Sequence, residues 1–155
     1  MVAALRRAGF EVVGSDIADG WDFLTVPVPR SFRGIITNPP YTLATKFIER
    51  ALSLVPEDGF VAMLLRCDFD SAKKRKHLFG GCPQFAKKLT LTQRIRWFED
   101  CRASPSFNHA WFVWLRAHQG PPTIAYGPPS ILAGKGATKR MTEWKAMPAL
   151  PKFHI

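Results

Sequence analysis

The stretch GIITNPPY, residues 34–41, decides the fold that this sequence predicts. Its first half, GIIT, is a short apolar run rich in β-branched side chains, which is typical of a buried strand. Asn38, Pro39, Pro40 and Tyr41 follow it directly, and we call these four residues the tetrad. Because ligands of open α/β sheets bind at the carboxyl ends of strands, the tetrad stands where a site is expected.

An amphipathic helix is predicted directly after the tetrad. Leu43, Phe47, Ala51 and Val55 repeat every four residues with charged side chains between them, which is the pattern of a helix with one buried face. The next apolar run, residues 60–65 (FVAMLL), predicts another buried strand. Strands that alternate with helices in this way indicate a parallel α/β sheet.

Two further elements are predicted on the amino-terminal side of the tetrad. Residues 2–9 have the pattern of the end of an amphipathic helix, which Gly9 closes. Residues 10–15 (FEVVGS) are apolar and β-branched, so we expect a buried strand there, with Asp16 at its end.

The pattern changes on the carboxyl-terminal side. Residues 71–79 (SAKKRKHLF) predict a basic helix, and residues 88–98 and 110–115 predict two strands that form an antiparallel hairpin at one edge of the sheet. Glycines and prolines then interrupt every periodicity. We therefore expect one folded domain over residues 1–119 and an irregular, basic tail over residues 120–155.

Composition narrows the class of protein. The chain has 155 residues, of which 46% are hydrophobic and 22% charged, so it can bury the core of one domain. No apolar run approaches the ~20 residues that span a bilayer, and no signal-peptide pattern is present, so we expect a soluble cytoplasmic protein without a membrane partner. Three cysteines without a CxxC pair and four scattered histidines favour neither a disulfide framework nor a metal site.

Net charge points to the kind of partner. Lys and Arg number 22 against 12 Asp and Glu, a net charge of +10, which favours a polyanion such as nucleic acid. A basic block is formed by Lys73, Lys74, Arg75 and Lys76 together with Lys87, Lys88, Arg94 and Arg96, and we expect phosphate contacts from it. A solvated helix face explains these residues equally well.

The tetrad itself suggests a chemistry. Two consecutive prolines lack N–H donors, which leaves backbone carbonyls without local competition. The side-chain oxygen of Asn38 and the carbonyl of Pro39 could then accept both hydrogens of an exocyclic amino group, while Tyr41 offers a flat face to a base. The alternative is a plain Pro-Pro turn between strand and helix, with Asn38 near the cap.

With these residues in this order, the chain resembles the class I S-adenosylmethionine-dependent methyltransferases, from about residue 2 to residue 116. Within that class it is similar to N6-adenine DNA methyltransferases, and most of all to small phage-type enzymes with an AWFVW-like late strand. The resemblance implies a Rossmann-like α/β fold, a catalytic domain over residues 1–119, S-adenosyl-L-methionine as cofactor and the adenine N6 amino group in DNA as acceptor. RNA bases, a protein glutamine, or a non-catalytic nucleic-acid-binding remnant are the alternatives.

The resemblance also implies roles for residues outside the tetrad. Asp16 and Ile17, in the GSDI stretch, match the acidic strand end that holds the cofactor ribose, and Asp22 and Phe23 match the pair that holds its adenine. Phe107 matches an aromatic residue that lies against the other face of the flipped base. Asp16 and Asp22 could instead be turn residues, and Phe107 a core anchor.

One feature of the resembled family is missing from this sequence. The family has a Gly-rich loop after its first, central strand, and residues 2–9 match the helix that would follow that loop. We therefore expect a mostly parallel sheet that lacks its first central strand. Unpaired backbone at such an edge would favour self-association, and the oligomeric state is left open.

Overall fold

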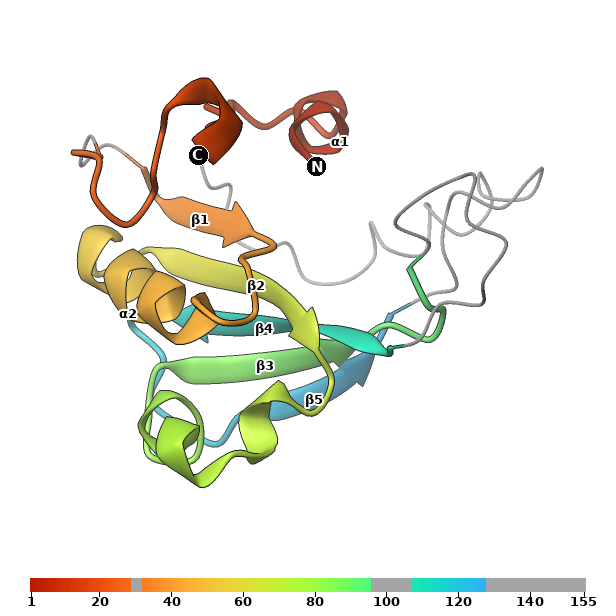
Figure 1. Cartoon of the computed structure of the whole chain (residues 1–155). Coiled ribbons are helices and arrows are strands. Elements are labelled where there is room, and N and C mark those ends of the chain that lie inside the picture. Colours follow the sequence, from red (N-terminus) through yellow and green to blue (C-terminus); the bar gives the residue numbers. More distant parts are fainter. Residues whose placement is uncertain (29–31, 96–106, 128–155) are drawn as a thin grey trace.

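The computed structural model describes residues 1–28, 32–95 and 107–127, and these residues form a five-stranded mixed sheet with helices packed on it (Figure 1). The strand order is β1-β2-β4-β3-β5. The strands are β1 (Gly34–Thr37), β2 (Phe60–Arg66), β3 (Phe85–Thr90), β4 (His109–Leu115) and β5 (Thr123–Tyr126).

Four of the strands point the same way. β1 is parallel to β2 and β3 is parallel to β5, while β4 is antiparallel to both β2 and β3. The carboxyl ends of β1, β2, β3 and β5 therefore lie along one edge, together with the start of β4. We call this the tetrad edge, because the tetrad follows β1 there.

The helices are α1 (Val2–Arg7), α2 (Ala44–Leu54) and three short 3₁₀ helices, η1 (Ile17–Asp19), η2 (Phe69–Ser71) and η3 (Lys73–Leu78). α2 lies across one face of the sheet, and α1 lies beyond β1 (Figure 1). α1 borders an apolar hollow with Ile36, Ala62 and Trp111 of β1, β2 and β4. The hydrophobic core lies on the α2 face.

Alternation along the strands builds this core. Val61, Met63 and Leu65 of β2 point to the α2 face and are completely buried, as are Phe112 and Trp114 of β4. Side chains two residues apart in a strand share a face, so one strand contributes every second residue to the core. Figure 1 shows α2 lying across this face of the sheet.

The structure confirms the elements with the clearest local patterns. The strand predicted over residues 34–37 has those bounds, the helix after the tetrad is α2, and residues 60–65 belong to β2. Residues 110–115 belong to β4, and α1 ends at a turn where Gly9 has φ +90°. Only glycine adopts that φ without strain, as expected for a helix stop.

The strand predicted over residues 10–15 was wrong. These residues are irregular and largely exposed; the Val13 side chain, for example, is 71% exposed. A strand needs a neighbour for its N–H and C=O groups. β1 pairs with β2 alone within the described part of the chain, so this apolar run takes part in no ladder there.

The edge hairpin and the start of the tail also need correction. β3 and β4 are antiparallel as predicted, but β4 lies inside the sheet, because β2 and β3 flank it. β5, inside the segment predicted to be irregular, pairs with β3 from Lys87 to Thr90. Pro122 precedes β5 and Gly127 follows it, so the breakers delimit a short strand instead of preventing one.

Two element bounds differ as well. The strand predicted over residues 88–98 is β3, which begins at Phe85 and ends at Thr90, and residues 96–98 lie outside the described ranges. The basic helix predicted from residue 71 is the 3₁₀ helix η3. Residues 128–155 of the predicted tail lie outside the described ranges too.

Candidate functional site

The tetrad forms the turn that leads from β1 into α2. The backbone N–H of Leu43 donates to the Pro40 carbonyl at 2.9 Å, and the N–H of Ala44 donates to the Tyr41 carbonyl at 3.5 Å. Pro39 is buried, whereas Asn38 and Pro40 are exposed and the Tyr41 side chain is 41% exposed. The tetrad therefore presents an amide and an aromatic ring to solvent at the carboxyl end of β1, the strand end after which the sequence placed it.

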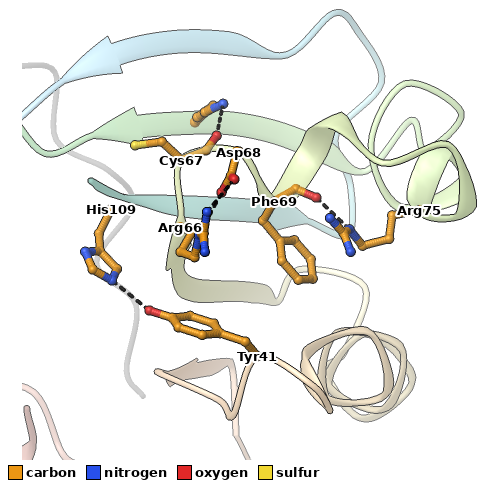
Figure 2. Close-up of polar contacts among 8 residues, drawn as sticks. Tyr41, Arg66, Cys67, Asp68, Phe69, Arg75 and His109 are labelled. Atoms are coloured by element: carbon orange, nitrogen blue, oxygen red, sulfur yellow. Dashed lines mark hydrogen bonds and ion pairs between the residues drawn. The ribbon is translucent and has the colours of Figure 1, made fainter. Parts of the chain in front are cut away.

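Tyr41 is held by a buried histidine that the sequence did not single out. Its hydroxyl lies 2.7 Å from Nε2 of His109, which is 2% exposed (Figure 2). The two rings are nearly parallel, with an interplanar angle of 28° and centroids 6.4 Å apart. His109 is the first residue of β4 and stands opposite Arg66, the last residue of β2. The contact joins residues 68 positions apart, and no local pattern reveals it.

Both side chains of this pair are uncharged at neutral pH. Burial lowers the pKa of His109, the Phe107 backbone partly offsets this, and the positive charge of Arg66 lowers it further. Burial raises the pKa of Tyr41, and Arg66 opposes that shift. A protonated phenol and a neutral imidazole can share one hydrogen bond, so the Tyr41 ring has a fixed orientation at the site.

Arg66 forms a second cluster at the same edge. Its guanidinium makes two hydrogen bonds to Asp68, Nε to Oδ1 at 3.0 Å and Nη2 to Oδ2 at 2.7 Å (Figure 2). The guanidinium carbon also lies 4.0 Å from the centroid of the Phe107 ring. The hydrogen bond from Arg66 lowers the pKa of Asp68. Asp68 and Phe107 together hold the guanidinium in one plane.

Phe107 lies at the tetrad edge, and its predicted contact with a base stays a prediction. Its side chain is 47% exposed, and Arg66 covers one face of the ring. The next residue, Asn108, accepts a hydrogen bond from Nε of Arg94 at 3.0 Å. Two arginines thus converge on the start of β4, a few residues from the tetrad's partner His109.

Asp16 and Ile17 lie in a turn, which is the alternative that the sequence offered for Asp16. Asp16 caps η1, because its Oδ1 accepts a hydrogen bond from the N–H of Ala18 at 3.0 Å. Both residues are exposed, and Ile17 is 74% exposed. Gly20 closes this turn with φ +80°. The carboxylate is accessible, but it follows an irregular segment and not the strand that the resemblance implies.

Asp22 and Phe23 are already engaged by the protein. The Asp22 carboxylate accepts from the N–H of Leu24 at 2.9 Å through Oδ1 and from the Thr25 hydroxyl at 3.2 Å through Oδ2, which is an Asx-turn. The Phe23 ring stacks on Phe47 of α2, with centroids 5.0 Å apart. Each carboxylate oxygen of Asp22 thus has one donor and one face of the Phe23 ring is covered, so an adenine held here would share these groups with their present partners.

The structure divides the basic block: Arg94 reaches the tetrad edge through Asn108, whereas η3, which carries Lys73, Lys74, Arg75 and Lys76, ends at the opposite edge. Arg75 folds back on η2: its Nε donates to the Phe69 carbonyl at 2.6 Å and its guanidinium lies 4.0 Å from the Phe69 ring centroid (Figure 2). η3 ends at Leu78, whose carbonyl accepts from Trp114 Nε1 at 2.7 Å. Trp114 pairs with Val61 near the start of β2, so η3 ends at the edge opposite the tetrad. Lys73, Lys74 and Lys76 are exposed.

Within the described ranges, no three His, Cys, Asp or Glu side chains gather closely enough to hold a metal ion. In the same part of the chain, no helix has the length and apolar character needed to cross a membrane. No protein-family model and no curated protein matches the chain. What is shown is an α/β fold with a mixed five-stranded sheet and a polar, aromatic cluster at one edge.

Proposed function

We propose that this protein is an S-adenosyl-L-methionine-dependent methyltransferase whose acceptor is the N6 amino group of adenine in DNA. One observation carries the proposal: the tetrad follows a strand at the carboxyl edge of an α/β sheet, with Asn38 exposed and the Tyr41 ring fixed by His109. A site that must hold a planar amino group needs two acceptors and a flat, oriented surface.

The tetrad supplies these groups. The Asn38 side-chain oxygen and the Pro39 carbonyl accept the two amino hydrogens, while Tyr41 stacks on the base and contributes ~1–3 kcal/mol. A nitrogen that attacks a methyl group becomes positively charged, and hydrogen bonds to the two oxygens strengthen as this charge develops. These residues thus orient the nitrogen and stabilise its charge without forming a covalent intermediate.

The methyl donor in this proposal is S-adenosyl-L-methionine, which supplies an electrophilic methyl group when bound. Asp22 contacts Leu24 and Thr25, and Phe23 contacts Phe47, so these two residues already have partners within the protein. Binding of S-adenosyl-L-methionine is therefore measured separately from methyl transfer. Isothermal titration of the protein with S-adenosyl-L-methionine measures it directly. The same engagement favours a second candidate, a nucleic-acid-binding protein that carries the tetrad without transferring methyl groups.

Tritiated methyl transfer to unmethylated DNA, to RNA and to a glutamine-containing protein separates the candidates. We expect label in DNA. Label in RNA or protein alone would keep the reaction and change the acceptor, and the net charge of +10 argues against protein. No transfer to any of them, with salt-sensitive DNA binding retained, would refute the enzyme and support the second candidate.

Asn38→Ala tests the role of the tetrad amide. It should abolish transfer and leave DNA affinity nearly unchanged, because the amide holds one amino group and not the DNA backbone. Asn108→Ala is the matched control, since Asn108 is also exposed at the tetrad edge but bonds to Arg94. A large loss of DNA affinity in Asn38→Ala, or an equal loss of transfer in both variants, would contradict this role.

A further inference from the structure

The described residues include two Arg–Asp pairs that have similar ion-pair distances and similar exposure. Arg66 and Asp68 are 2.7 Å apart with side chains 37% and 62% exposed, and Arg33 and Asp58 are 2.8 Å apart with side chains 42% and 57% exposed. They lie at opposite edges of the sheet. Arg66 ends β2 at the tetrad edge, whereas Arg33 precedes β1 and Asp58 precedes β2.

Only the pair at the tetrad edge has an aromatic support among the contacts of the described residues. The Phe107 ring lies 4.0 Å from the Arg66 guanidinium, and Asp68 bonds to it through two parallel hydrogen bonds. Arginine binds a phosphate with the same two-pronged geometry as a carboxylate. Asp68 therefore occupies the place that two oxygens of a phosphate would take.

We propose that Arg66 binds a backbone phosphate of the nucleic acid, exchanging its bond to Asp68 for one to the phosphate next to the nucleotide at Tyr41. The inference rests on the proposed function for the position of that nucleotide. Arg66 would thereby make a phosphate contact of the kind that was predicted for the basic block.

Three observations support the position of this contact. Arg66 is close enough to Tyr41 and His109 for its charge to act on both. Arg94 reaches Asn108, beside Phe107, and adds a second positive charge at the same edge. On η3, by contrast, Arg75 is committed to Phe69.

The exchange of partners is energetically feasible. The Asp68 side chain is 62% exposed, so water can solvate its carboxylate when Asp68 turns away from Arg66. Phe107 keeps the guanidinium in place, so little side-chain freedom is lost when phosphate binds. A peptide carboxylate has the same fork geometry, but the net charge of +10 favours a polyanion with many phosphates.

The test compares charge changes at the two edges. Binding of a fluorescent single-stranded 12-nucleotide DNA is measured against NaCl concentration, without any methyl donor, for the wild type, Arg66→Gln and Arg33→Gln. Arg66→Gln should lower the slope of log affinity against log salt by about 0.7 and weaken binding roughly tenfold. Arg33→Gln should leave the slope unchanged within error.

A second pair of variants removes the carboxylate partners of Arg66 and Arg33. Asp68→Asn removes the competitor of the phosphate and should tighten binding about threefold more than Asp58→Asn, which changes net charge equally. Folding of each variant is checked by circular dichroism. If Arg66→Gln does not fold, the Asp68→Asn and Asp58→Asn comparison decides.

Equal effects of the two arginine variants, or equal effects of the two aspartate variants, would overturn the proposal. So would a slope that falls only when Lys73, Lys74 and Lys76 are changed together to Gln, because the basic block would then hold the phosphates. The proposal would also be overturned if Arg66→Gln weakened binding of an acidic peptide that contains glutamine and left binding of DNA unchanged. Binding that depends on Arg66 without methyl transfer would refute the proposed enzyme and leave this inference standing.

Discussion

Removal of the Tyr41 hydroxyl should destabilise the protein through its partner, His109. The hydroxyl bonds to Nε2 of His109 at 2.7 Å, and His109 is 2% exposed. In Tyr41→Phe this buried nitrogen loses its hydroxyl partner, which costs about 1–2 kcal/mol. The Tyr41 side chain is 41% exposed, and phenylalanine fills the same space, so we expect no added cavity cost.

Urea unfolding measures this effect. We expect the free energy of unfolding to fall by about 1–2 kcal/mol, and the midpoint to fall by about 0.5–1 M with an unchanged m-value. Tyr126→Phe is the matched control, because Tyr126 is the other of the chain's 2 tyrosines and is 72% exposed on β5. It should change the midpoint by less than about 0.2 M.

A double-mutant cycle measures how much of the lost stability comes from the contact between Tyr41 and His109. In a His109→Leu background no buried nitrogen is left for Tyr41 to satisfy, so Tyr41→Phe should cost less than about 0.5 kcal/mol. The coupling between Tyr41 and His109 is then about 1 kcal/mol. Equal losses in Tyr41→Phe and Tyr126→Phe, or the same loss in both backgrounds, would show that the 2.7 Å contact does not fix the ring.

Two further predictions concern pH and packing. Burial lowers the folded-state pKa of His109 below its usual value of 6.5, so below that pH the unfolded chain takes up a proton that the folded chain does not. The free energy of unfolding should therefore be constant above about pH 7 and fall as the pH drops below 6.5. Urea unfolding at pH 7.5, 6.5 and 5.5 checks this, and a slope that persists in His109→Leu would assign it to another group. Gly34→Ala should cost about 1–3 kcal/mol, because a Cβ there would lie 2.3 Å from the Phe60 ring. Gly80→Ala, where a Cβ meets nothing within 4 Å, is its control in thermal unfolding, and equal melting temperatures would contradict the clash.

Local patterns predicted the part of the fold that surrounds the tetrad. The run GIIT is β1, the four-residue repeat after the tetrad is α2, and FVAMLL belongs to β2. These elements could be predicted from the sequence because their apolar residues follow a period of two or 3.6 residues. The order of the elements then placed Asn38 and Tyr41 after the end of a strand. Whether the tetrad binds an amino group stays a prediction, and so do the roles of Asp16 and Phe107.

The same patterns failed where structure depends on a distant partner. The run FEVVGS has the composition of a strand but no neighbouring strand in the described sheet, whereas TIAY, between breakers, pairs with β3. An isolated extended segment leaves its backbone groups unpaired, so composition alone cannot decide between strand and coil.

The sequence by itself therefore determined the tetrad, its place after a buried strand and the helix that follows it. Only the tertiary structure decided what surrounds Tyr41. It set His109 against the Tyr41 hydroxyl from 68 residues away and placed Arg66 on Phe107 at the same edge, while Asp22 closed its own Asx-turn and Phe23 stacked on Phe47 of α2. The physical reason is that the antiparallel pairing of β2 with β4 fixes which residues meet at the edge, and that register is a property of the assembled sheet.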